Sequence, residues 1–84
     1  MRYKLYDLDN KFIKEIEVVP NNFTGIVECR DGTKQWFIDG ISHRLDGPAF
    51  IVNGSSKFWY INGKQVTELQ HKLLCDIMKL KGIT

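Results

Sequence analysis

The sequence predicts an α+β fold, an antiparallel β-meander of about six short strands with one C-terminal amphipathic helix packed on one face. Five Asx-Gly pairs punctuate residues 31–63, and such pairs favour the tight turns that join hairpin strands. The segments between them are rich in β-branched and aromatic residues, which favour strands. In the last segment the hydrophobic period changes from that of a strand to that of a helix. A chain of 84 residues is expected to form one domain, 1–84.

Residues 1–19 are predicted to form an N-terminal hairpin. Two extended runs, RYKLYDL and FIKEIEVV, flank the polar segment 9–11, whose side chains suit a tight turn. In the second run Phe12 and Ile16 alternate onto one face. Pro20 then ends the pairing, because proline has no N–H to donate to a ladder.

Residues 23–66 are predicted to form a meander of repeated hairpins. The Asx-Gly pairs, each expected to supply positive φ at a hairpin turn, are Asp31-Gly32, Asp39-Gly40, Asp46-Gly47, Asn53-Gly54 and Asn62-Gly63. The run Trp36–Gly40 recurs as Trp59–Gly63. A three-residue loop with a bulge at Gly54 would absorb one extra residue in the second unit. With this register, Val27 faces Trp36 and Ala49 faces Trp59.

Alternation sorts the meander into two apolar faces. The first face, which the two tryptophans anchor in the core, holds Val27, Cys29, Trp36, Ile38, Ala49, Ile51, Trp59 and Ile61. The second holds Ile26, Phe37, Phe50, Phe58 and Tyr60. A sheet face of this kind must be covered or must bind something.

Residues 67–82 are predicted to form the helix. Thr67 is the expected N-cap, with Gln70 completing a capping box, and Gly82 is the expected C′ glycine. The stripe expected to cover the sheet consists of Leu69, Leu73, Ile77 and Leu80, with Leu74 on its flank. The arc expected to face solvent consists of His71, Lys72, Cys75, Asp76 and Lys79.

The most distinctive polar stretch is His43–Ala49, in a connection between two strands. Its structural interpretation is a turn that Asp46 caps, with Arg44 paired to a nearby carboxylate or carbonyl. In its functional interpretation, His43 and Arg44 contact a phosphate or an acidic partner, because a guanidinium forks onto anions. A metal site would have to recruit Cys29, Cys75, His43 and His71 from distant positions without a recognisable ligand spacing. A nucleophilic pair of Cys29 and His43 is disfavoured because Cys29 alternates onto the face of core residues, so we expect no metal, no cofactor and no catalytic residue.

The second face is also a candidate binding surface, because its aromatic residues interleave with Lys57 and nearby Arg44. The N-terminal hairpin or a partner subunit in a homodimer would cover it. Alternatively, the face binds a protein, or binds single-stranded RNA by stacking bases and contacting phosphates. The residues expected to bind a partner are Phe37, His43, Arg44, Phe50, Lys57, Phe58 and Tyr60.

The segment 36–49, followed by Trp59–Gly63, resembles the repeat W-[YF]-x-[ND]-G-x-x-H-R-x-D-G-P-A. This repeat occurs in small proteins of tailed bacteriophages and some large viruses and is similar to MORN-type β-hairpin repeats. The second unit departs from it, since Lys64-Gln65-Val66 replaces the histidine-arginine stretch, and it resembles a capping half-repeat. The resemblance implies a phage accessory protein acting in the host cytoplasm.

Composition narrows the function further. The net charge of +2 is far below the excess of a dedicated nucleic-acid binder, and no apolar run is long enough to span a membrane. We therefore expect a cytoplasmic, non-enzymatic interaction module without membrane contact. The resemblance to the phage repeat further implies that it binds and inhibits a host protein, such as a defence factor or toxin. An RNA-binding protein acting against a host ribonuclease system is the alternative, and a small hydrolase centred on His43 and Asp46 is the least favoured.

Overall fold

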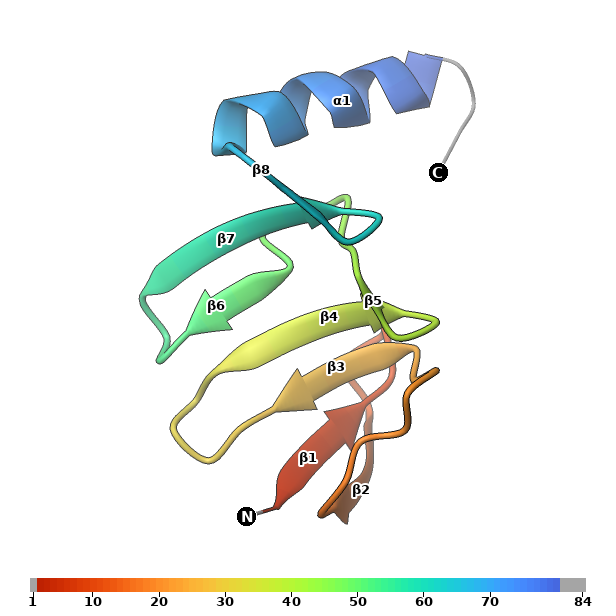
Figure 1. The fold of residues 1–84 in the computed structure, drawn as a ribbon, viewed down its shortest axis with the longest axis vertical. Helices are drawn as coiled ribbons and strands as arrows, with labels where there is room; N and C mark the ends of the chain where they lie inside the picture. The colour runs from red at the N-terminus through yellow and green to blue at the C-terminus, as the bar shows by residue number, and fades with distance from the viewer. Residues whose placement is uncertain (1, 81–84) are drawn as a thin grey trace.

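The computed structural model describes residues 2–80 and shows one antiparallel sheet followed by one helix (Figure 1). The elements are β1 (Tyr3–Tyr6), β2 (Phe12–Ile16), β3 (Gly25–Glu28), β4 (Lys34–Ile38), β5 (Ile41–Ser42), β6 (Phe50–Val52), β7 (Ser56–Ile61), β8 (Lys64–Val66) and α1 (Glu68–Leu80). The predicted α+β class is confirmed, with eight strands in place of about six. The strands beyond that number are short, because β5 and β8 contain two and three residues.

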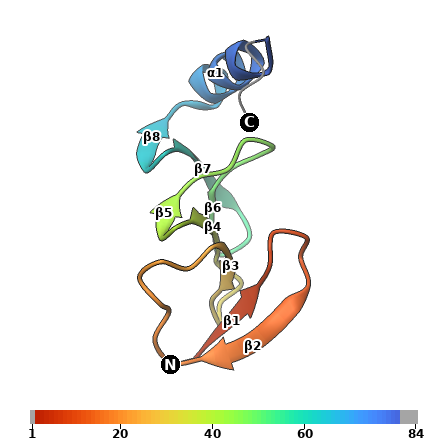
Figure 2. The same cartoon turned by 90° about the vertical axis from the view of Figure 1, so that its right-hand side faces the viewer.

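The strands lie in the order β2-β1-β3-β4-β6-β7-β8, and β5 pairs with β4. From β3 onward this is the predicted meander. The N-terminal hairpin departs from it, because β3 pairs with β1 and not with β2. The chain therefore crosses from β2 to β3 through residues 17–24, which project to one side of the sheet in the edge-on view of Figure 2.

Four of the five predicted Asx-Gly turns have the expected left-handed glycine, and the fifth does not. Gly32, Gly40, Gly54 and Gly63 have φ of 88°, 76°, 75° and 80°. Gly47 does not lie in the left-handed region, so the hairpin turn predicted at Asp46-Gly47 is wrong. A Cβ on Gly47 would lie 2.9 Å from Cζ of Arg44, so this glycine makes room for a guanidinium.

The register of the first repeat unit differs from the prediction by one residue. Ile26, not Val27, pairs with Trp36. The reason is the preceding loop: Cys29 N donates to Thr33 O at 2.7 Å, which leaves three loop residues where a two-residue turn was expected. In the second unit the predicted three-residue loop is confirmed, because Val52 pairs with Ser56 across residues 53–55.

This change of register moves residues between the faces of the sheet. Ile26 joins the face of Trp36, and Val27 joins Leu5 on the face of Phe37. The buried hydrophobic core consists of Leu5, Ile26, Val27, Ala49, Ile61 and Cys75. Trp36 and Trp59, which were expected to be core anchors, are only half-buried.

The predicted start of α1 is confirmed by a complete capping box. Thr67 N donates to Gln70 Oε1 at 2.9 Å, and Gln70 N donates to Thr67 Oγ1 at 3.1 Å. The predicted C′ glycine, Gly82, lies outside the described residues.

The predicted orientation of α1 is wrong. The apolar residues expected to cover the sheet are exposed, namely Leu69, Leu73, Leu74, Ile77 and Leu80. His71 and Cys75, which were expected to face solvent, are both 5% exposed. They lie one turn apart on the same side of the helix, and this side packs because backbone carbonyls outside the helix accept their hydrogen bonds.

Candidate functional site

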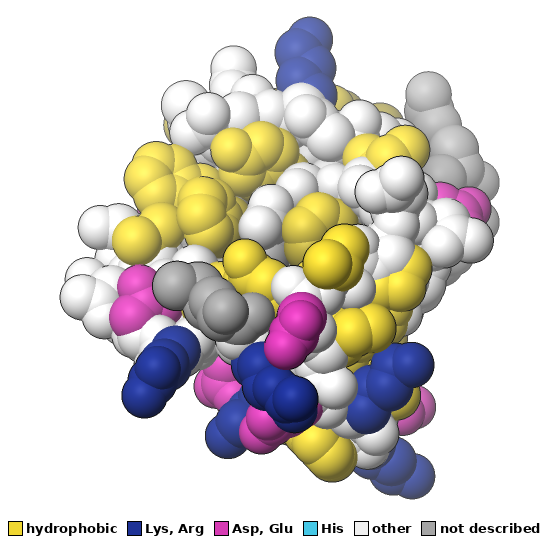
Figure 3. Space-filling view, turned by 60° about the horizontal axis from the view of Figure 1, so that its bottom comes forward, with side chains coloured by type: hydrophobic (Ala, Val, Ile, Leu, Met, Phe, Trp, Pro, Cys, Tyr) yellow, Lys and Arg dark blue, Asp and Glu magenta, His cyan; other side chains and the backbone are white. Residues whose placement is uncertain are grey.

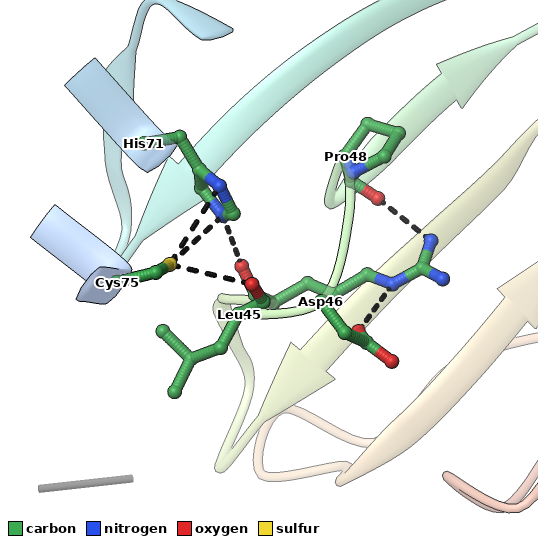
Figure 4. Close-up of polar contacts among 6 residues, drawn as sticks. Leu45, Asp46, Pro48, His71 and Cys75 are labelled. Carbon is green, nitrogen blue, oxygen red and sulfur yellow. Dashed lines mark hydrogen bonds and ion pairs between the residues drawn. The ribbon is translucent and has the colours of Figure 1, made fainter. Parts of the chain in front are cut away.

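The connection between β5 and β6 is held by Arg44. Its guanidinium carbon lies 4.0 Å from the ring centroid of Trp36. Arg44 Nε donates to Asp46 Oδ1 at 2.8 Å, and a terminal nitrogen donates to Pro48 O at 3.1 Å (Figure 4). The bond from Arg44 is the main reason that the pKa of Asp46 lies below its usual value. These contacts agree with the structural interpretation of His43–Ala49, in which Arg44 pairs with a nearby carboxylate or carbonyl. Arg44 makes both kinds of contact.

Two side chains of α1 are hydrogen-bonded to the same connection between β5 and β6. His71 Nε2 donates to the carbonyl of Arg44, and Cys75 Sγ donates to the carbonyl of Leu45 at 3.3 Å (Figure 4). A backbone carbonyl only accepts hydrogen bonds, so Nε2 must carry the ring proton. Sequence reasoning missed this contact, although the spacing of His71 and Cys75 by four residues was a signal that both lie on one side of a helix.

His71 and Cys75 also form a close pair, because Sγ lies 3.7 Å from Nδ1. A nucleophilic cysteine requires the thiolate form. Burial raises the pKa of Cys75, and its sulfur faces a carbonyl that would repel a thiolate. The arrangement therefore favours a neutral thiol with a packing role.

His43 lies on the other side of this connection and joins it to the turn between β7 and β8. Its Nδ1 accepts a hydrogen bond from Asn62 N at 2.9 Å. Desolvation, followed by the nearby charge of His71, lowers the pKa of His43. Protonation of Nδ1 would remove the acceptor, so the neutral ring is the form that this turn requires.

We expect this bond to make folding pH-dependent. Because the pKa of His43 is lower in the folded state, the unfolded chain binds protons more readily there, so stability should fall as the pH drops below about 6.5 and towards the folded pKa. His43→Gln retains an acceptor but does not titrate, so it should flatten this slope. The measurement is urea unfolding at about pH 7.5 and about pH 5.5. Equal slopes in the two proteins would assign the pH dependence to other groups.

The structure divides the seven predicted partner-binding residues between the two faces of the sheet. By register, Phe37, Phe50, Phe58 and Tyr60 share one face. Lys57 pairs with Ile51 and therefore points to the opposite face. His43 and Arg44 lie on that opposite face as well, where they line a groove with Trp36.

The groove lies between the β1–β2 turn and the connection held by Arg44. It has a volume of about 620 Å³, with Ile26, Trp36 and Ile38 among its lining residues. Lys34 and Arg44 supply its basic groups, and Asp46, which is paired with Arg44, also lines it. It could accept an apolar or acidic side chain, and its basic residues are separated from the aromatic face by the sheet.

The aromatic face is partly covered. Phe37 lines a small depression with Val19, Pro20 and Phe23, so the chain between β2 and β3 borders this end of the face, and Phe37 itself is half-buried. The remainder of the face is the aromatic patch, which we define as Phe50, Phe58 and Tyr60. Each of these three side chains is half-buried and keeps part of its surface exposed.

The aromatic patch spans two paired strands. Phe50 faces Phe58 across β6 and β7, with ring centroids 5.8 Å apart. Tyr60 follows Phe58 by two residues, so it lies on the same face. Figure 3 shows hydrophobic side chains gathered on the side of the molecule where β6 and β7 lie in Figure 1. The patch therefore presents a contiguous apolar surface with one phenolic hydroxyl.

Among residues 2–80, no three His, Cys, Asp or Glu side chains lie close enough to hold a metal ion. The described part of the chain also contains no helix with the length and apolar character to cross a membrane. No protein-family model, curated protein or solved structure matches the chain. The resemblance to viral repeat proteins thus depends on the motif alone and stays a prediction.

Proposed function

We propose that the protein is a non-enzymatic interaction module that binds another protein through the aromatic patch. The observation that carries this proposal is the partial exposure of Phe50, Phe58 and Tyr60, three neighbouring aromatic side chains on one face of the sheet. Aromatic side chains are enriched at protein interfaces, where they supply large contact areas at a small cost in conformational entropy.

The resemblance of the repeat makes a host protein the proposed partner. A phage accessory protein of this size has room for a binding surface and needs no catalytic site to block a defence factor or toxin. In this proposal the protein acts in the host cytoplasm, and inhibition follows from occupation of a surface on the host protein.

The geometry favours a protein partner over RNA. A single-stranded RNA site combines stacking rings with basic residues along one surface. Here Lys57 points to the face opposite the aromatic patch, and Arg44 is paired with Asp46 and Pro48. The nearest predicted phosphate contacts are thus displaced from the rings or already engaged.

We expect Tyr60→Ser to weaken partner binding by about 2 kcal/mol, the size of an aromatic hot spot, and to leave the melting temperature nearly unchanged. The partner would be captured by affinity purification from infected cells, with and without RNase treatment, and titrated by calorimetry. Tyr3→Ser is the matched control, because Tyr3 is also half-buried but lies on β1.

Equal affinities of the Tyr60 and Tyr3 variants would reject the aromatic patch as the binding surface. Loss of the captured partner after RNase treatment would show that the protein binds RNA and not a protein. In that case the affinity for the RNA should also fall steeply as the salt concentration rises. An affinity that does not depend on salt would instead support a protein partner.

A further inference from the structure

A row of exposed apolar side chains lies on α1. We define the helix stripe as Leu69, Leu73, Ile77 and Leu80, whose side chains are 66%, 53%, 48% and 88% exposed. We propose that the helix stripe is a dimerisation surface, on which a second copy of this chain packs its own α1 in antiparallel orientation. This inference is independent of the aromatic patch.

The helix stripe cannot turn inward. Its residues are spaced by four, four and three positions, which places them on one side of a helix. His71 and Cys75 occupy the opposite side, where they hold the carbonyls of Arg44 and Leu45. Rotating α1 to bury the stripe would break both hydrogen bonds and expose a histidine and a thiol that are now buried. No element within residues 2–80 covers the stripe, so it is open to another molecule.

The charged residues of α1 indicate that the molecule covering the helix stripe is a second copy of this chain. Beside the helix stripe runs a row of exposed charged residues with alternating sign, namely Glu68, Lys72, Asp76 and Lys79. Read in reverse, the row has the opposite sign at every position. An antiparallel pair related by a two-fold axis therefore sets Glu68 against Lys79 and Lys72 against Asp76 of the second copy.

The apolar residues have the same symmetry. When the charged row is aligned in this way, Leu69 lies level with residues 78–79 of the second copy and Leu73 lies level with residues 74–75. Leu69 is thus within one turn of Leu80, and Leu73 is within one turn of Ile77. A parallel pair would bring both positive ends of the helix macrodipoles together and equal charges to the same level. The antiparallel arrangement thus satisfies the apolar contacts, the charged contacts and the dipoles together.

The expected dimer is reversible. Two helices of 13 residues, each about 20 Å long, form a contact at the low end of specific interfaces, below about 1,200 Å² in total. We therefore expect monomer and dimer to exchange at micromolar concentrations. Because α1 lies against the connection between β5 and β6, the aromatic patch of each copy would stay free, and the dimer would offer two of them to a partner.

Sedimentation velocity over a concentration series tests the dimer. We expect the sedimenting mass to rise from 9.8 kDa towards twice this value, and Ile77→Lys to weaken dimerisation roughly tenfold or more. Ile13→Lys is the matched control, because Ile13 on β2 is 47% exposed and Ile77 is 48% exposed. A chain that stays monomeric at several hundred micromolar, or equal effects of both variants, would overturn the proposal.

Charge reversal tests the identity of the cover. Lys72→Glu and Asp76→Lys should each dimerise more weakly, because each places equal charges opposite one another twice. An equimolar mixture of the two variants should recover dimerisation, since both contacts are then attractive. Unchanged dimerisation in the single variants would show that the row does not face a second copy.

Disulfide formation between introduced cysteines tests the orientation in a Cys29→Ser background. A mixture of Leu69→Cys and Leu80→Cys chains should form mixed disulfides, and neither variant alone should cross-link efficiently. Efficient linkage of Leu69→Cys to itself would indicate a parallel pair and overturn the proposed arrangement. Monomeric protein that instead floats with anionic phospholipid vesicles would assign the helix stripe to a lipid surface.

Discussion

Leu5→Ala is expected to lower the free energy of unfolding by about 3 kcal/mol. Leu5 is 1% exposed and is the largest fully buried side chain in the described chain. It lies in β1, between β2 and β3, where it pairs with Lys14 on one side and Val27 on the other. Since only six hydrophobic residues are buried among residues 2–80, few side chains are available to fill the cavity that the substitution would leave.

Urea unfolding followed by circular dichroism measures this effect. Ile13→Ala is the control, because it removes a similar apolar side chain from the adjacent strand, where Ile13 is 47% exposed. Its expected loss is within about 0.5 kcal/mol. Similar losses in the two variants would show that the core does not centre on β1. A domain of this size could lose its folded state through Leu5→Ala alone, and proton NMR of the variant without denaturant would reveal that outcome.

The turns were the part of the fold that the sequence predicted best. An Asx-Gly pair determines its own backbone conformation, because few other residues adopt positive φ at low energy. Four of the five glycines behave accordingly. Gly47 does not, since its lack of a side chain serves the packing of Arg44, and a sequence shows only that a glycine is present. The loop after Cys29 has one residue more than expected, and this is enough to exchange Ile26 and Val27 between faces.

The candidate site was predicted only in part. The four aromatic residues share a face as expected, because alternation within one strand is a local property. Lys57, His43 and Arg44 were assigned by nearness in sequence, and the structure places them across the sheet. Whether a side chain is available to bind a partner depends on contacts with residues distant in sequence. The Arg44 guanidinium packs on the ring of Trp36, and His71 of the helix is hydrogen-bonded to the Arg44 carbonyl.

The orientation of α1 could not be inferred from periodicity. A hydrophobic stripe predicts the buried side only when nothing polar on another side finds partners within the fold. His71 and Cys75 find them in two backbone carbonyls, and buried carbonyls without donors would be unfavourable. The exposed stripe is then the side left over for another molecule.

His71→Ala should loosen α1 far more than Leu73→Ala, the reverse of what side-chain hydrophobicity predicts. Removing the imidazole leaves the Arg44 carbonyl without its donor and opens a cavity, which together are expected to cost about 2–3 kcal/mol. Leu73 is 53% exposed, and alanine is a better helix former, so its substitution should change stability by less than about 0.5 kcal/mol. Both proteins are compared well below micromolar concentration, where the proposed dimer dissociates.

The thiol of Cys75 provides the measurement, because it is 5% exposed and reacts only when α1 separates from the connection that holds it. In a Cys29→Ser background, His71→Ala should accelerate thiol labelling by roughly thirtyfold, the equivalent of about 2 kcal/mol. Leu73→Ala should label at the parent rate. His71→Gln, whose amide can donate to the same carbonyl, should fall between the two. If Leu73→Ala labelled faster than His71→Ala, the apolar stripe would be the packed side of the helix, and the proposed dimer would lose its surface.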